Sequence, residues 1–290
     1  MMKKIIIVLV VMLALVVTGC GSSSKKSDNN KNAKGIENVS KGDTKANIKE
    51  QVILDENGVK ITMKSIDYSS RYDVEIKLLV ENNTDDDISV QVDDLSINDI
   101  MIYPVFYANV NAGKKVNETI DLSKEDLELA NITTIGTIEL SINVYNPNTW
   151  KDITTKKGIK VETDAKNYVQ KYNTDGKLLY DQEGIKIYFL KLDQSNSLWG
   201  ADMYLYIENN TKQNITVQAN DVSVNGYMID PMFSATVNAG KKIYDTITFF
   251  NSDLDKNEIT DIKEVELKFD IFDPDTWEDI VITGAKKITF

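Results

Sequence analysis

Apolar and polar residues alternate along several stretches of the chain. This pattern predicts β-strands, because successive side chains in a strand point to opposite faces of the sheet. Residues 74–80, 138–144 and 265–271 show it clearly, with Val, Ile, Leu or Phe at every second position. Two four-residue segments, 55–58 and 181–184, end in Gly between apolar stretches and predict hairpin turns.

The sequence contains an internal repeat. Residues 208–247 repeat residues 81–120 at an offset of 127, with 23 identities in 40 positions and no gap. Extending the match predicts repeat 1 over 51–163 and repeat 2 over 178–290, joined by a linker over 164–177. Seven or eight strands in roughly 113 residues are typical of an immunoglobulin-like sandwich. The sequence therefore predicts an all-β protein with two tandem immunoglobulin-like β-sandwich domains.

The first residues predict an export signal. Two lysines precede an apolar run over residues 5–17, which is shorter than the roughly 20 residues that a spanning helix needs. The run ends in Val17-Thr18-Gly19-Cys20, which resembles the lipobox of bacterial lipoproteins, and Cys20 is the only cysteine in the chain. The resemblance implies that residues 1–19 are removed as a signal peptide and that lipid is attached to Cys20.

A polar segment follows the cysteine. Residues 20–50 are rich in Ser, Lys and Asn and contain few apolar residues, so we expect a disordered linker. A lipidated cysteine, a polar linker and tandem sandwich repeats together resemble a broad group of uncharacterised Gram-positive surface lipoproteins. The resemblance implies a protein held on the cell membrane by the lipid on Cys20, facing outside the cytoplasm.

Composition and charge exclude several functions. The chain has no histidine, and its one cysteine is assigned to lipid, so neither Ser-His-Asp nor Cys-His catalysis is available. The net charge is −12, and because the first 50 residues are basic, residues 51–290 carry −17. Nucleic acid requires a basic surface, so it is not an expected partner. We predict that the protein is not an enzyme.

Aromatic residues are the first candidates for a binding site. Trp150 and Trp277 each end a Pro-x-Thr-Trp sequence, at equivalent places in the two repeats. A tryptophan in a loop can stack on a sugar or anchor a partner protein. The same residue in both copies equally suits a packing role required by the fold, which is the favoured interpretation. Three further aromatic residues are possible binding residues, namely Phe106 and Phe233, which suit the core better, and Trp199.

A calcium site is the second candidate. Asn251, Asp253, Asp255 and Asn257 alternate with other residues, as oxygen ligands do in a calcium-binding loop. The alternative interpretation is a short helical turn with acidic residues near its start, expected near 253–257 and, in repeat 1, near 124–128. No other cofactor is expected.

These observations predict a non-enzymatic binding or interaction module of the cell envelope. The partner would be an envelope protein or a polysaccharide, in addition to the membrane that holds the lipid. A calcium- or glycan-binding surface module is the alternative.

Overall fold

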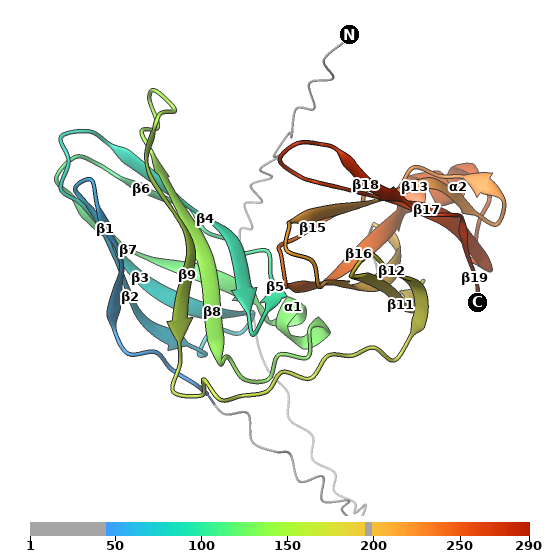
Figure 1. Ribbon diagram of the computed structural model, residues 1–290, viewed down its shortest axis with the longest axis horizontal. Coiled ribbons are helices and arrows are strands. Elements are labelled where there is room, and N and C mark those ends of the chain that lie inside the picture. Colours follow the sequence, from blue (N-terminus) through green and yellow to red (C-terminus); the bar gives the residue numbers. More distant parts are fainter. Residues whose placement is uncertain (1–44, 195–198) are drawn as a thin grey trace, which may run out of the picture. The chain divides into compact units, whose positions relative to one another are not determined.

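The computed structural model describes residues 45–194 and 199–290 (Figure 1). In these ranges the regular secondary structure is β-strand apart from two short helices. The strands of repeat 1 are β1 (Gln51–Glu56), β2 (Val59–Asp67), β3 (Asp73–Asn82), β4 (Ile88–Ile97), β5 (Ile100–Met101), β6 (Ala108–Val110), β7 (Lys115–Ser123), β8 (Thr137–Tyr145) and β9 (Asp152–Glu162). Those of repeat 2 are β10 (Lys177–Gln182), β11 (Ile185–Asp193), β12 (Gly200–Asn209), β13 (Ile215–Val224), β14 (Tyr227–Met228), β15 (Ser234–Val237), β16 (Lys242–Phe250), β17 (Glu264–Phe272), β18 (Asp279–Ile282) and β19 (Lys286–Thr289).

Repeat 1 is built from two antiparallel layers. One layer has the order β1-β2-β3-β7, and the other has the order β5-β4-β8-β9, with β6 also paired to β4. Burial alternates strictly along β3, where Val74, Ile76, Leu78 and Val80 are buried and the residues between them are less so. The alternation seen in the sequence is therefore the inside and outside of a sheet.

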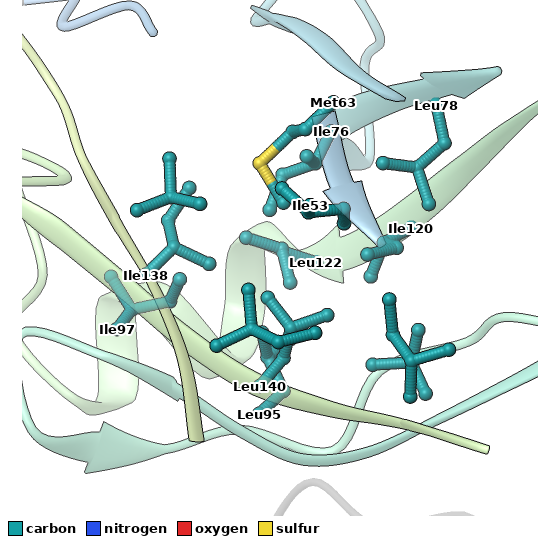
Figure 2. Close-up of a cluster of buried hydrophobic side chains, with 14 of the residues drawn as sticks. Ile53, Met63, Ile76, Leu78, Leu95, Ile97, Ile120, Leu122, Ile138 and Leu140 are labelled. Carbon is teal, nitrogen blue, oxygen red and sulfur yellow. The ribbon is translucent and has the colours of Figure 1, made fainter. Parts of the chain in front are cut away.

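The core of repeat 1 lies between its two layers. Figure 2 shows side chains of both layers, with Met63, Ile76 and Leu122 from one layer and Leu95 and Leu140 from the other. All five are almost completely buried. This two-layer core confirms the predicted β-sandwich class.

Repeat 2 has the same plan. Its layers have the orders β10-β11-β12-β16 and β14-β13-β17-β18, with β15 paired to β13 and β19 to β17. Strand β5 of repeat 1 also pairs in parallel with β16 of repeat 2. Where β9 of repeat 1 is continuous, repeat 2 has two strands, β18 and β19, separated by residues 283–285. This split and the two-residue strands β5 and β14 raise the strand number in the described residues above the seven or eight expected for each repeat.

The repeated Glu-Asn-Asn-Thr sequence forms a buried polar node in each copy. The Asn82 side-chain amide donates to the carbonyl oxygens of Asp86 (2.8 Å) and Val110 (2.9 Å). Its oxygen accepts from the Thr84 backbone N–H at 3.0 Å and from the Thr84 hydroxyl at 2.7 Å. Asn209 makes the same four bonds at the same lengths in repeat 2. The recurrence of this sequence motif in both repeats therefore reflects the fold, because a buried side-chain amide needs all of its hydrogen-bond partners.

Both expected helical turns are present. Helix α1 covers Lys124–Leu129, and the Ser123 hydroxyl caps it by accepting from the Asp126 N–H at 3.4 Å. Helix α2 covers Asn251–Lys256 and has no such side-chain cap. Among residues 45–194 and 199–290, no helix is long and apolar enough to cross a membrane.

The end of the predicted N-terminal linker lies against repeat 1. Ala46 and Ile48 are buried, and the Tyr68 hydroxyl donates to the Ala46 carbonyl at 2.8 Å. The Asn47 side-chain oxygen accepts from the Ile66 N–H at 2.9 Å. Residues 46–48 thus belong with the sandwich, although their polar surroundings in the sequence gave no sign of it.

The predicted linker over 164–177 also packs. The Gln170 side chain is buried, where its oxygen accepts from the Asn98 amide at 3.0 Å and its nitrogen donates to the Asn131 carbonyl at 2.9 Å. Further along, the Asn173 N–H donates to the Tyr244 hydroxyl at 2.6 Å. These bonds hold the middle of the segment to Asn98 and Asn131 of repeat 1 and to Tyr244 of repeat 2.

Candidate functional site

The two Pro-x-Thr-Trp sequences form one loop in each repeat, which we call tryptophan loop 1 (residues 146–150) and tryptophan loop 2 (residues 273–277). Each loop connects the eighth strand of its sandwich to the next one, β8 to β9 in repeat 1 and β17 to β18 in repeat 2. The loops therefore hold their tryptophans at the end of a rigid strand.

In loop 1 the side chain of Asn146 organises the turn. Its oxygen accepts from the N–H groups of Asn148 (2.9 Å) and Thr149 (3.1 Å). Two backbone bonds close the loop, from the Trp150 N–H to the Asn146 carbonyl (2.8 Å) and from the Asn146 N–H to the Lys151 carbonyl (2.9 Å). Pro147 restricts Asn146 to extended backbone, which directs the chain out of β8 and into the turn.

Loop 2 has the same geometry with a carboxylate in place of the amide. Asp273 accepts from the N–H groups of Asp275 (2.8 Å) and Thr276 (3.0 Å), and the Trp277 N–H donates to the Asp273 carbonyl at 2.9 Å. These backbone donors favour the charged form, so they lower the pKa of Asp273 below its ordinary value of 3.8.

Each loop presents its tryptophan on the surface. Trp150 is 76% exposed and stacks on Tyr145, with ring centroids 5.5 Å apart and planes at 12°. Trp277 is 65% exposed and stacks on Phe272 at 5.4 Å and 16°. One ring face thus rests on the last residue of the preceding strand and the remainder meets solvent. Neither tryptophan is buried in a core, but each packs one ring face at the end of a strand, so the packing role and the binding role both stay predictions.

Both tryptophans also have an unusual backbone conformation. Their φ angles are 58° and 62°, in the left-handed region that residues with bulky side chains rarely adopt. Such a conformation costs on the order of 1–3 kcal/mol. A glycine or asparagine would satisfy the turn with less strain, yet each loop holds its largest side chain there.

Loop 1 has hydroxyl and amide groups beside its tryptophan. Tyr107 is half-exposed, and its hydroxyl lies 3.2 Å from that of Ser89. Ser89 donates to the Asn109 side-chain oxygen at 2.5 Å, so its single proton is used and Tyr107 is the donor to Ser89. The Tyr145 hydroxyl lies within hydrogen-bonding reach of Tyr107. Burial raises the pKa of Tyr145, which keeps this hydroxyl protonated.

Loop 2 lacks these phenolic hydroxyls. At the offset of 127, Phe272 replaces Tyr145 and Ser234 replaces Tyr107. Thr216 and Thr236 replace Ser89 and Asn109, and their hydroxyls lie 2.9 Å apart. Ser89, Tyr107, Asn109 and Tyr145 of repeat 1 were not among the residues predicted from the sequence, although the Tyr145 to Phe272 difference between the aligned copies was a signal that could have found them.

The other aromatic candidates lie elsewhere. Phe233 is 8% exposed within the core of repeat 2, and Phe106 is partly buried against the core of repeat 1. Trp199 is 71% exposed, and its carbonyl accepts from the Asn251 N–H at 2.7 Å. The Tyr72 carbonyl accepts in the same way from Lys124 at 2.9 Å, so Tyr72 is the counterpart of Trp199 in repeat 1. In the part of the chain that the structure describes, Trp150 and Trp277 stack on Tyr145 and Phe272 and not on these three candidates.

The four candidate calcium ligands do not converge. Asn251, Asp253 and Asp255 lie on helix α2, where residues two apart point about 200° away from one another. Asn257 follows the helix and donates from its side chain to the Asp253 carbonyl at 2.8 Å. Within the described ranges, no group of three or more Asp, Glu, His or Cys residues is placed to hold a metal ion. Cys20, the predicted lipidation site, lies outside these ranges.

Comparisons with known proteins add little. No protein-family model matches the chain, and no curated protein matches it. The chain is similar to the solved structure of the Salmonella enterica SafA pilin in complex with the SafB chaperone, at 11% identity and a TM-score of 0.20, over 74% of this chain and 89% of that one. It is also similar to the YadV chaperone (10% identity, TM-score 0.23, 74% and 92% covered) and to CBD12 from CALX1.2 (8%, 0.20, 72% and 78%). Likenesses with such low TM-scores carry no argument, so the fold rests on the sheets described above.

Proposed function

We propose that this chain is a membrane-anchored, extracytoplasmic lipoprotein whose two sandwiches form a non-enzymatic binding module of the cell envelope. The single observation that carries the binding role is the pair of tryptophan loops. In each, an exposed Trp is held in a strained conformation on a rigid strand end. Strain that recurs in both copies at a solvent-exposed aromatic residue is better explained by contact with a ligand than by packing.

The anchor rests on the lipobox, Val17-Thr18-Gly19-Cys20, and on Cys20 being the only cysteine. Two acyl chains give stable membrane attachment where one gives only marginal binding. Fractionation of cells that produce Cys20→Ser tests this part. We expect the variant in soluble fractions or with its signal uncleaved, and retention on the membrane after cleavage would refute the anchor.

The binding role is tested by photo-crosslinking on the producing cells. A photo-reactive residue at Asn148 or Asp275 lies in a tryptophan loop, is exposed, and leaves both tryptophans intact. We expect a recurrent envelope component to be captured from at least one position. The matched controls are Trp150→Asn and Trp277→Asn, because Asn adopts the left-handed conformation readily and preserves the turn.

Capture that disappears in the control supports the proposal. Capture that is unchanged in both controls, or that yields only lipid and random neighbours, refutes it.

A further inference from the structure

The surface of repeat 1 beside loop 1 joins a flat aromatic ring to a fixed row of polar groups. Trp150 stacks on Tyr145, and hydrogen bonds run from Tyr107 to Ser89 and on to Asn109. Trp150 and Tyr107 are both exposed, and Asn109 is exposed at the end of the row. The row brings aromatic faces, hydroxyl oxygens and an amide together on one surface.

This combination matches the chemistry of a sugar ring. The C–H face of a pyranose is apolar and packs on an aromatic ring, while its hydroxyls both donate and accept hydrogen bonds. Because the row already fixes which hydroxyl donates to which, a ligand meets polar groups that are oriented before it binds. Such preorganisation lowers the cost of binding.

The charge of the protein further restricts the class of ligand that this surface can bind. Next to Trp150 stand Lys151 and Asp152, whose charges cancel. Residues 51–290 carry −17, so a polymer rich in phosphate or carboxylate would be repelled. An uncharged saccharide meets no such barrier.

Repeat 2 provides a control within the same chain. Its Trp277–Phe272 stack matches that of repeat 1 within 0.1 Å in centroid distance, 5.4 against 5.5 Å. It has neither phenolic hydroxyl, and loop 2 with its two following residues contains four carboxylates, on Asp273, Asp275, Glu278 and Asp279. The aromatic platform is therefore shared, while the polar row and the neutral surroundings belong to repeat 1 alone.

We infer that the surface formed by Trp150, Tyr107 and Asn109, with the buried Tyr145 supporting the Trp150 ring, binds an uncharged saccharide, with a sugar ring on Trp150 and its hydroxyls toward Tyr107 and Asn109. The corresponding surface of repeat 2 does not bind it. This inference rests on the proposed binding function and names the ligand class for one of its two loops.

Titration of the full chain in detergent with uncharged oligosaccharides tests the inference. The probes are chitohexaose, cellohexaose, maltoheptaose and mannohexaose, followed by calorimetry and by tryptophan fluorescence. We expect at least one to bind. Trp150→Asn should weaken it at least about tenfold, as the loss of an interface anchor does. Trp277→Asn should leave the affinity unchanged.

The double variant Tyr107→Ser with Tyr145→Phe isolates the polar row. It copies the residues of repeat 2, so the sandwich tolerates them, and it keeps a ring under Trp150. We expect a loss of about three- to tenfold for each hydrogen bond removed.

Failure of all four probes to bind, or equal losses in Trp150→Asn and Trp277→Asn, would overturn the inference. The crosslinking experiment separates this failure from that of the proposed function. If capture from Asn148 still depends on Trp150 and yields a protein, the binding function stands and the saccharide is wrong. If neither Asn148 nor Asp275 captures a recurrent envelope component, both proposals are refuted.

Discussion

Asn146 in repeat 1 and Asp273 in repeat 2 close the same turn, with bonds to the second and third following N–H groups that differ in length by about 0.1 Å. Each turn ends in a tryptophan that stacks on the aromatic side chain at the end of the preceding strand, Tyr145 or Phe272. The surroundings differ, since repeat 1 places tyrosine hydroxyls and balanced charge there and repeat 2 places phenylalanine and carboxylates. Duplication thus preserved the presentation of an aromatic ring and changed the chemistry around it. The hydrogen bonds of the turn, which both repeats share, belong to the fold, and the groups that differ around each tryptophan determine which ligand we propose it contacts.

The largest expected effect concerns the buried polar node of Asn82 and Asn209, whose hydrogen bonds are the same in both repeats. Asn82→Ala removes the partner of three backbone groups, the carbonyls of Asp86 and Val110 and the N–H of Thr84. We expect a loss of about 3 kcal/mol in the free energy of unfolding, because buried polar groups are left unpaired. Urea denaturation of Asn82→Ala and Asn209→Ala should show equal losses. A loss in only one of them would mean that the node is structural in one repeat alone.

The next effect concerns the row of hydrogen-bonded polar groups on Tyr107, Ser89 and Asn109 of repeat 1. Ser234→Tyr together with Phe272→Tyr places the two phenols of repeat 1 in repeat 2, and Asp275→Asn with Glu278→Lys reduces the charge of loop 2 as in loop 1. We expect the fourfold variant to bind a second equivalent of the oligosaccharide that repeat 1 binds, with an affinity within about tenfold of it. The measurement is the stoichiometry by calorimetry. A stoichiometry that stays at one, in a variant whose unfolding is unchanged, would show that these groups are insufficient to define the site.

A smaller effect distinguishes the Asn146 amide of loop 1 from the Asp273 carboxylate of loop 2. The pKa of Asp273 is lowered in the folded protein, so its charged form stabilises loop 2. This contribution is complete above the ordinary value of 3.8 and is lost as the pH falls below it. NMR titration from pH 6 to pH 2 should shift the amide signals of Asp275 and Thr276 in that range.

Asp273→Asn gives loop 2 the residue of loop 1 and should abolish the titration, while the Asn148 and Thr149 signals serve as the control that does not move. Unchanged Asp275 and Thr276 signals in the native chain would contradict the role of the carboxylate.

The sequence predicted the fold well, for identifiable reasons. Period-two burial along β3 and β17 was visible as alternating residues, and Asn-Gly at 57–58 marked the hairpin between β1 and β2. The short helices also stood where acidic turns indicated them. These features are local, so a single stretch of sequence contains the whole signal.

The candidate site was only partly visible. Trp150 and Trp277 were noticed because they repeat, but their exposure depends on a left-handed backbone that no residue preference indicates. Tyr107, Ser89 and Asn109 are separated from Trp150 by about 40 to 60 residues and meet it only through sheet pairing, of β4 with β6 and with β8. The alternation of Asn and Asp over 251–257 indicated a calcium loop, and a helical turn distributed those side chains around its axis instead.

The proposed function requires that the two strained tryptophans contact a ligand and are not needed for the fold. Urea unfolding of Trp150→Gly with Trp277→Gly tests it most directly. Glycine relieves a left-handed strain of about 1–3 kcal/mol per site, while each lost ring stack costs about 0.5–1.5 kcal/mol. We therefore expect a free energy of unfolding equal to or above that of the native chain, together with loss of the captured envelope component. A loss of stability of more than about 2 kcal/mol, with capture unchanged, would show that the tryptophans are packing residues and would contradict the account.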